Sequence, residues 1–257
     1  MSVFSGLTRK TLFSSVSAER RKKEHDCYLK NGSAVLEELL ALCDGNCRIP
    51  IRYFSAIEIH NAIKYSKCRI NLSDVYITGS LDNHLVLVRF NRCRLNNIHR
   101  DIAVTAQMSH LKNVLRLVGC CLEFEQLVYE YVEENCYYLE DGNRLRIANE
   151  VASAIVFLHT EFTTPIIFKD LNPSNVIIDQ NSGVGKILDF SLSISLPPGK
   201  LEVVKDITSR NGCLAPEYAI SGIVTQKADV YSFGVVLLQL LTGEKMSTLN
   251  IEDPEYI

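Results

Sequence analysis

Hydrophobic and polar positions follow two different periods along the chain, and the change of period divides it into three parts. Residues 32–43 (GSAVLEELLALC) repeat apolar side chains at helical spacing until Gly45 ends the pattern. A second helix is predicted within residues 51–66 (IRYFSAIEIHNAIKYS), where Ser55 and Glu58 have the spacing of a capping box. The chain therefore begins with a helical prelude.

The middle of the chain shows the period of two that is typical of strands. The alternation predicts four strands, in residues 73–81, 84–90, 114–124 and 125–132. A helix is predicted between the two strand pairs, over residues 99–111. Residues 145–160 then form an amphipathic helix, and residues 230–243 form a helix that is apolar on nearly every side. A small antiparallel sheet followed by a helical half predicts an α+β fold.

Composition adds limits to this picture. At 257 residues, with 47% hydrophobic and 22% charged residues, the chain can bury a core, and we expect one bilobal domain. The net charge of −3 argues against nucleic-acid binding, and no apolar run reaches the length of a transmembrane span. The nine cysteines lack CxxC pairs, which favours a reducing cytosol, and Cys120 and Cys121 are expected to be buried structural residues.

The N-terminus leaves the location open. Residues 1–17 contain no acidic residue and many Ser and Thr, as transit peptides can, while Ser2 excludes a myristoylation signal. The basic cluster from Arg20 to Lys23 either touches an anionic membrane surface or begins a solvated helix. We expect a cytoplasmic protein, with peripheral association at the inner face of the plasma membrane as an alternative.

Several longer stretches resemble a known family. GCCLE, LVYEYV, RLRIANEVASAIVFLH and APEYAISGIVTQKADVYSFGVVLLQLLTG are similar to protein kinases, and with IRYFSAIEIHNAI they resemble the receptor-like cytoplasmic kinases of plants. RKKEHDCYLKNGSAVLEELL and DFSLSISLPPGK are most similar to the pseudokinase adaptors of a coiled-coil NLR immune receptor.

The resemblance implies a bilobal kinase-like fold, with a small antiparallel-sheet N-lobe and a helical C-lobe. It places a tail and helical prelude at residues 1–50, the N-lobe at 51–132 and the C-lobe at 133–257. Little chain follows LLQLLTG, so we expect a C-lobe without its last helices, and an exposed apolar patch on the helix before them.

The phosphate-covering loop of the kinase pattern, G-x-G-x-x-G, is absent. KCRINLSDVYITG has no glycine before Gly79, which matches the glycine after the second strand of that loop. Asn71, Ser73 and Asp74 place side chains where bare backbone normally approaches the triphosphate, and a carboxylate there repels it. The resemblance gives Gly79 a place beside the cofactor, and ATP binding is expected to be weak.

The strand LVLVRF stands where the kinase pattern has V-A-I-K, so Arg89 replaces the lysine that contacts the nucleotide phosphates. The glutamate that pairs with this lysine is also missing, and Asp101 is the nearest acid, although an alignment shifted by one residue gives Ile102. Arginine does not substitute conservatively for lysine. Arg89 either keeps a phosphate contact or ends its strand as a solvated cation.

The stretch FKDLNPSN matches the catalytic loop pattern H-R-D-L-x-x-x-N. Asp170 keeps the position of the catalytic base, and Asn175 keeps that of a metal ligand. Phe168 and Lys169 replace the histidine and the arginine. Asn172 replaces the lysine that steadies the transferring phosphate, which removes a positive charge from the site where transition-state charge develops.

The segment KILDFSLS matches the metal-binding D-F-G, with Asp189 kept and Ser191 in place of glycine. The resemblance therefore names Asn175 and Asp189 as magnesium ligands. Asp170 and Asp189 could instead persist only as hydrogen-bonding anchors of their loops. Asp229 matches the aspartate that organises the catalytic loop, and Ala215 to Glu217 end the activation segment.

Thr208 and Ser209 lie in that segment, where a regulatory phosphate could sit, although Lys169 is a weaker bidentate receptor for it than arginine.

Together these changes predict a kinase-fold protein with little or no phosphotransfer, since that reaction depends on several positioning groups at once. The resemblance implies a pseudokinase adaptor in plant innate immunity, whose partners are an NLR receptor and effector-modified cytoplasmic kinases. The alternative is a weak ATP-dependent Ser/Thr kinase that uses Arg89 and Asp170, with ATP and Mg²⁺ as possible, weakly bound cofactors.

Overall fold

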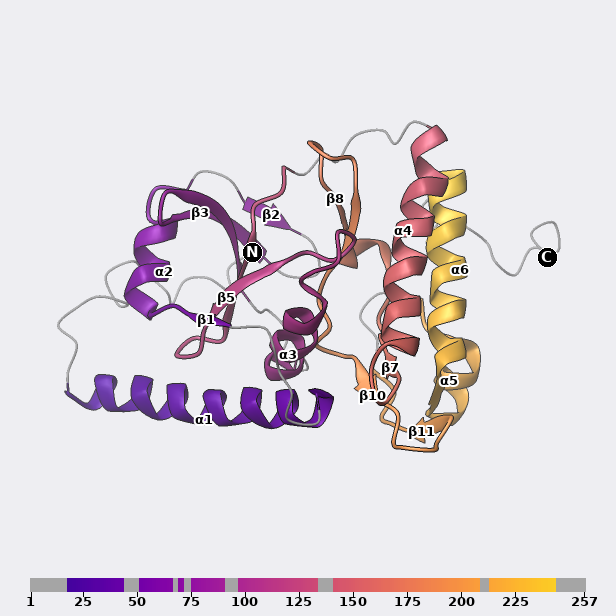
Figure 1. The fold of residues 1–257 in the computed structure, drawn as a ribbon, viewed down its shortest axis with the longest axis horizontal. Coiled ribbons are helices and arrows are strands. Elements are labelled where there is room, and N and C mark those ends of the chain that lie inside the picture. The colour runs from indigo at the N-terminus through magenta and orange to yellow at the C-terminus, as the bar shows by residue number, and fades with distance from the viewer. Residues whose placement is uncertain are drawn as a thin grey trace, which may run out of the picture.

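A computed structural model describes residues 18–43, 51–66, 69–71, 75–90, 97–133, 141–208 and 213–243. It has two parts, a sheet with its helices and a helical half (Figure 1). The sheet has six strands in the order β1-β5-β6-β4-β3-β2. Its strands are β1 (Arg52–Tyr53), β2 (Arg69–Asn71), β3 (Val75–Leu81), β4 (His84–Phe90), β5 (Leu117–Cys121) and β6 (Gln126–Glu130).

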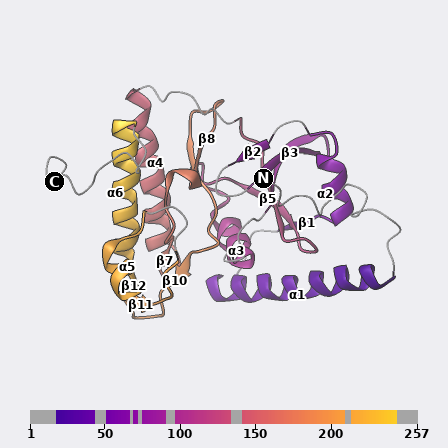
Figure 2. The same ribbon diagram turned by 180° about the vertical axis from the view of Figure 1, so that it is seen from behind.

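Three helices accompany the sheet: α1 (Ala18–Cys43), α2 (Ala56–Ile63) and α3 (Ile98–Met108). One sheet face packs on α2 through a cluster that includes Val86, Val88 and Ile59. The opposite face, which carries Leu87 and Tyr129, joins a larger cluster with residues of α1 and α3. Figure 2 shows α1 lying below α3 when the molecule is viewed from behind.

Local sequence explains where several elements begin and turn. Ser55 and Glu58 form the predicted capping box of α2, with the Ser55 Oγ accepting from the Glu58 N–H and the Glu58 carboxylate accepting from the Ser55 N–H. Asp82 and Asn83 have φ of 50° and 63°, the left-handed conformation of a two-residue hairpin turn between β3 and β4.

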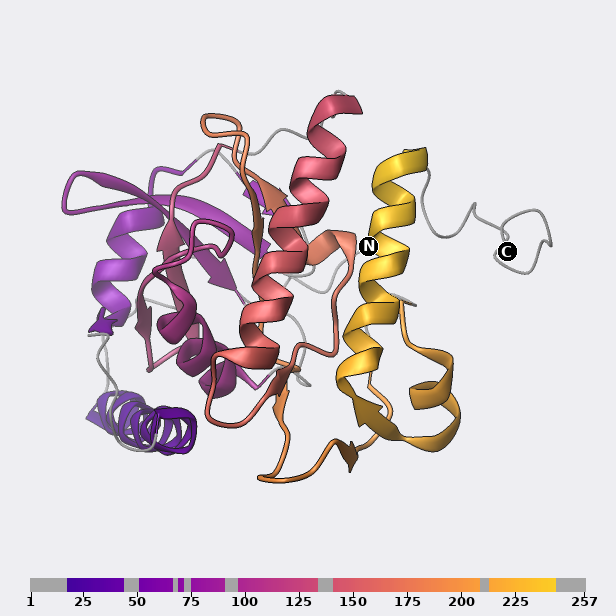
Figure 3. The ribbon, with the colours of Figure 1, turned by 45° about the vertical axis from the view of Figure 1, so that its right-hand side comes forward.

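The helical half is built on α4 (Asp141–Thr160) and α6 (Gln226–Thr242), which lie side by side in Figures 1 and 3. Between them in the chain come β7 (Ile166–Ile167), a 3-10 turn at Pro173–Asn175, β8 (Val176–Ile178), β9 (Gly185–Ile187), β10 (Ile194–Ser195), β11 (Glu202–Val204), α5 (Pro216–Ser221) and β12 (Ile223–Thr225). These strands form the antiparallel pairs β7/β10, β8/β9 and β11/β12.

One hydrophobic cluster runs through both parts. It includes Val35 of α1, Leu87 of the sheet, Ile177 of β8, Phe190 of a loop, and Val236 of α6. The two parts are therefore held together by packed side chains as well as by the chain that connects them.

The predicted α+β class and bilobal arrangement are confirmed. α1 is longer than the helix predicted from the apolar pattern over residues 32–43, and the basic cluster from Arg20 to Lys23 lies in its first turns, as the solvated-helix alternative expects. Cys120 and Cys121 are buried as expected, and burial raises the pKa of each thiol to about 12. Within the described ranges, every helix falls short of the length or hydrophobicity needed to span a bilayer. The N-terminal residues 1–17 lie outside the described residues.

Candidate functional site

Arg89 lies at the centre of the site. It sits on β4, opposite Tyr76 of β3, and only 1% of its surface is exposed. Its Nη1 forms an ion pair with Asp101 of α3, and its Nη2 lies 2.9 Å from Oδ1 of Asp189. The interpretation of Arg89 as a solvated cation is therefore wrong, because its guanidinium is buried between two carboxylates.

Asp101, and not Ile102, is the partner of Arg89. Its Oδ2 faces Arg89, while its Oδ1 accepts hydrogen bonds from the backbone N–H of Phe190 and the hydroxyl of Thr105, both at 2.9 Å. Ile102 packs in the core. Arginine is longer than lysine and aspartate is shorter than glutamate, so the two substitutions compensate each other in reach.

Burial and charge act against each other in this cluster. Burial, the largest influence, opposes the charged form of Arg89, but the carboxylates of Asp189 and Asp101 hold its pKa well above the ordinary value. Burial also raises the pKa of Asp101, an effect that Arg89 offsets only in part. The phenol of Tyr129 is fully buried beside the cluster, and its pKa is raised mainly by that burial. The positive charge of Arg89 thus offsets part of the free-energy cost of burying two carboxylates.

Asp189 has its Oδ1 committed to protein donors. This atom accepts from the Ser191 hydroxyl at 2.6 Å and the Ser191 N–H at 3.3 Å, in addition to the ion pair with Arg89. Asp189 has φ of 68°, so the turn adopts the left-handed conformation at the aspartate. The serine that replaces glycine therefore serves as a hydrogen-bond donor to its neighbour.

The catalytic loop is held together by its two asparagines. Nδ2 of Asn172 donates to the carbonyl of Asp170 at 2.7 Å, and Nδ2 of Asn175 donates to the same carbonyl at 2.8 Å. Asn175 also contacts the Asp170 carboxylate at 3.3 Å. Asn172, which stands where kinases have a lysine, thus stabilises the loop and supplies no charge.

These residues meet only part of the requirement for a magnesium site. Oδ1 of Asn175 is buried and has no hydrogen-bond partner among the described residues, which suits a cation ligand. Oδ1 of Asp189, in contrast, already accepts from Arg89 and Ser191. No group of three or more His, Cys, Asp or Glu side chains in the described part of the chain is arranged to hold a metal. An ion held jointly by Asn175 and Asp189 would therefore have to use the other carboxylate oxygen of Asp189 or displace these donors.

Asp229 of α6 fixes the start of the catalytic loop, as the motif predicts. Its two carboxylate oxygens accept from the backbone N–H groups of Phe168 and Lys169, each at 2.8 Å, and His159 Nε2 also lies 2.8 Å from Asp229. The Phe168 ring packs edge to face on Phe190, with centroids 5.2 Å apart. The replacement of the loop histidine therefore leaves an apolar contact in its place.

The activation segment is tied to the catalytic loop without a phosphate. Nζ of Lys169 donates to the Thr208 hydroxyl at 2.6 Å and lies 5.3 Å from the centre of the Tyr218 ring. The Tyr218 hydroxyl accepts from the Thr208 N–H at 3.1 Å. Ser209, the other predicted phosphate site, lies outside the described residues.

Gly79 does not lie beside Arg89. It pairs with Val86, whose side chain belongs to the sheet face covered by α2. A Cβ at Gly79 would meet Ala62 and Ile63 of α2 at 3.3 Å, so close helix packing explains the glycine. The prediction that Gly79 borders the cofactor is therefore not supported by its position. Residues 72–74, with Ser73 and Asp74, and the side chain of Asn71 lie outside the description.

Arg100 is a positioning residue that the motif comparison missed. Its guanidinium contacts Glu38 of α1 at 3.2 Å, the Ser193 hydroxyl at 3.2 Å and the Ser195 hydroxyl at 2.7 Å. It therefore joins α1, α3 and the start of the activation segment, one position before Asp101. The signal in the sequence was the charged pair Arg100–Asp101 next to the apolar run Ile102–Val104 of the same helix.

Comparison with known proteins agrees with this geometry. The protein kinase domain family matches residues 85–256. The non-functional pseudokinase ZED1 of Arabidopsis thaliana is 38% identical over 246 residues, which cover 88% of this chain and 73% of that protein. The non-functional pseudokinase ZRK2 of the same plant is 34% identical over 279 residues, 96% of this chain and 77% of the relative.

A third Arabidopsis thaliana relative carries a different kind of name. The serine/threonine-protein kinase ZRK1 is 35% identical over 276 residues, 95% of this chain and 78% of the relative. Kinase and pseudokinase names thus occur at similar identity. With the fold, the catalytic-loop geometry and these matches taken together, the chain belongs to the protein kinase family, and its relatives include proteins named non-functional pseudokinases.

Proposed function

We propose that this protein is a pseudokinase adaptor in plant innate immune signalling, which binds an NLR immune receptor and effector-modified cytoplasmic kinases. The observation that carries the proposal is the double ion pair of Arg89 with Asp101 and Asp189. The basic group that would meet nucleotide phosphates and the acid that would meet magnesium bind each other instead. The names of ZED1 and ZRK2 support the same conclusion.

Loss of positioning groups makes efficient phosphotransfer unfavourable. The reaction needs metal ions and cationic side chains held around the transferred group. Here Oδ1 of Asp189 already accepts hydrogen bonds from protein donors. Asn172 stabilises the catalytic loop but carries no positive charge. Because Asp189 competes with phosphate for the Arg89 guanidinium, we expect any binding of ATP and Mg²⁺ to be weak.

The surface of the activation segment favours a binding function. Val204, Ile207 and Ile220 are 73%, 53% and 85% exposed, and they border a shallow cavity of about 450 Å³. Leu201 nearby is 82% exposed. Exposed apolar groups that gather in this way mark protein interaction surfaces. We assign this surface to a protein partner of the adaptor.

The proposed function places the protein in the cytoplasm. Arg21, Lys22 and Lys23 are exposed on the first turns of α1 and can reach anionic headgroups at the inner face of the plasma membrane. Association with the membrane in this manner is peripheral and weakens with salt.

The first experiment is a thermal-shift titration with ATP, with and without Mg²⁺. A ligand that binds the native state raises the melting temperature, so the adaptor proposal expects no magnesium-dependent rise. Co-precipitation with co-expressed NLR receptors and cytoplasmic kinases then compares Ile220→Ser with Asp170→Ala. We expect the first variant to lose a partner and the second to keep it. Loss of every partner in Asp170→Ala alone would contradict the proposal.

A weak Ser/Thr kinase is the second candidate, because the catalytic loop with Asp170 and Asn175 keeps an ordered arrangement. Autophosphorylation that needs Mg²⁺ and disappears in Asp170→Ala would favour this function. Arg89→Lys provides a further comparison, since it restores the usual side chain at that position.

A further inference from the structure

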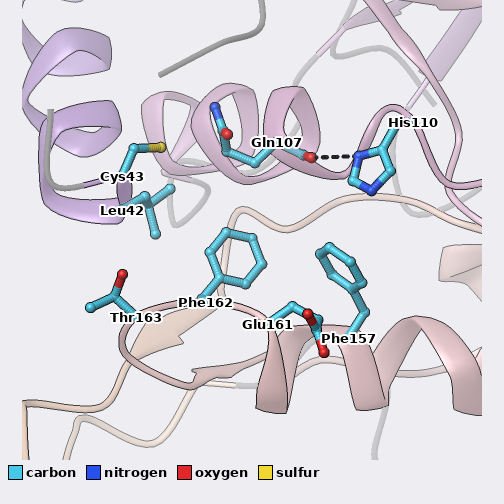
Figure 4. Close-up of a pocket in the computed structure, with 8 residues that line it drawn as sticks. All are labelled: Leu42, Cys43, Gln107, His110, Phe157, Glu161, Phe162 and Thr163. Carbon is cyan, nitrogen blue, oxygen red and sulfur yellow. Dashed lines mark hydrogen bonds between the residues drawn. The ribbon is translucent and has the colours of Figure 1, made fainter. Parts of the chain in front are cut away.

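A separate cavity lies where three helices end. It has a volume of about 310 Å³ and is lined by residues from the last turn of α1, from the end of α3, and from the end of α4 and the loop that follows it (Figure 4). It includes none of the residues that surround Arg89, so the function proposed above does not use it.

The helix ends give this cavity a negative field. α1 ends at Cys43, α3 at Met108 and α4 at Thr160, and Leu42, Gln107 and Phe157 come from these last turns. Each helix C-terminus carries the equivalent of about half a negative charge. No basic residue lies in the last turn of α1 or α3, and in α4 the only one, His159, is held by Asp229. The partial negative charges of the three helix C-termini therefore favour a cation in this cavity.

Aromatic rings line the cavity. Phe157 and Phe162 pack edge to face with centroids 5.9 Å apart, and His110 lies 5.4 Å from Phe157. Figure 4 shows both phenylalanine rings projecting from α4 and its loop toward α3. Such rings accept a cation over their faces and also pack against an aliphatic stem.

Several polar groups of the cavity can accept hydrogen bonds. Glu161 supplies a carboxylate, and Thr163 supplies a hydroxyl. Nδ1 of His110 lies 3.0 Å from the Gln107 carbonyl, which can only accept, so this contact places the proton on Nδ1. In the neutral form of the ring, Nε2 is then an acceptor. Among the described residues, neither a lysine nor an arginine lines this cavity.

We propose that this cavity binds the guanidinium group of an arginine side chain carried by another protein. A guanidinium is planar, stacks on aromatic rings and carries five donors, which match the carboxylate of Glu161, Nε2 of His110 and the hydroxyl of Thr163. Its aliphatic stem can lie against Leu42. Lysine carries the same charge on a compact ammonium, which cannot stack and hydrogen-bond in this way.

The test uses the blocked tripeptide acetyl-Gly-Arg-Gly-amide and its citrulline analogue, which has nearly the same shape without the charge. Titration into the full chain is followed by NMR of the Leu42 and Thr163 methyl groups. The arginine peptide is expected to shift both signals, less so as salt is added, and the citrulline peptide is expected to shift neither. Glu161→Gln should weaken binding about three- to tenfold, while Glu202→Gln, on the exposed strand β11, should leave it unchanged.

Equal shifts from both peptides, or none from the arginine peptide, would overturn the proposal. Agmatine separates a small-molecule site from a protein-binding site, because it carries the guanidinium without a peptide backbone. If agmatine binds and the arginine peptide does not, a protein partner is excluded. Melting curves of both variants verify that they are folded, and none of these results depends on the adaptor function.

Discussion

The cluster around Arg89 and the activation segment use charge in opposite ways. Arg89, Asp101 and Asp189 are each at most 1% exposed, and their charges are directed at one another. In the activation segment, Lys169 binds the neutral hydroxyl of Thr208, and aliphatic side chains beyond it face solvent. The cluster around Arg89 stabilises the contact between the two parts of the molecule, and the activation segment exposes an apolar surface. Charged groups can thus hold a fold together in one region while apolar groups face solvent in another.

The largest effect is expected from Arg89→Met. The change leaves Asp101 and Asp189 buried without a counter-charge, so the free energy of unfolding should fall by about 3–5 kcal/mol. Urea unfolding measures it. Arg52→Met is the matched control, because Arg52 pairs with Asp82 at the surface and its loss should cost less than about 1 kcal/mol. Similar losses in the two variants would remove the distinction between the buried cluster and a surface pair.

A smaller effect is expected where α1 supports α3, the helix that carries Asp101. Leu39 is 8% exposed in the core, and its truncation to alanine should lower the free energy of unfolding by about 2–3 kcal/mol. Leu40, next in the chain, is 51% exposed, and Leu40→Ala should change it by no more than about 0.5 kcal/mol. A separate unfolding transition for α1 would show that the helix does not support the cluster.

The smallest effect is expected from Thr208→Val, which removes the hydroxyl that Lys169 binds. One hydrogen bond contributes about 1 kcal/mol, so the free energy of unfolding should fall by no more than that. Trypsin cleavage after the exposed Lys205 should become faster, because the segment is released locally. Ser55→Ala, at the N-cap of α2, loses a comparable bond in the other part of the molecule. If cleavage after Lys205 is unchanged in Thr208→Val, or rises equally in both variants, the tie between Lys169 and the segment has no specific role.

Local pattern was sufficient for much of the fold and for part of the site. The capping box at Ser55, the turn at Asp82 and the paired strands depend on neighbours in the chain, and the structure has them where the pattern predicts. The choice of Asp101 over Ile102 required the geometry of α3. The start of α1 could not be fixed from the apolar pattern, because its first turns carry charged side chains and no apolar stripe, so the basic cluster there left two alternatives open.

The remaining misses concern contacts over long distances in the chain. Gly79 was matched to a cofactor by its motif, but the side of the sheet on which it lies depends on where α2 packs. The contacts of Arg100 with Glu38 and Ser195 join residues more than sixty positions from it on either side. The cavity at the three helix ends likewise exists only once α1, α3 and α4 have packed. The periodicity of the sequence reports neighbours along one helix or strand and does not predict contacts between distant segments.

Arg89 also determines what the shape of this molecule responds to. In an enzyme that closes around a nucleotide, closure follows the concentration of that nucleotide and so the energy supply of the cell. The tie between Arg89, Asp101 and Asp189 is made of side chains alone, and a guanidinium keeps its proton at any physiological pH. The strength of these ion pairs therefore depends on the amino-acid sequence and does not vary with the nucleotide concentration of the cell.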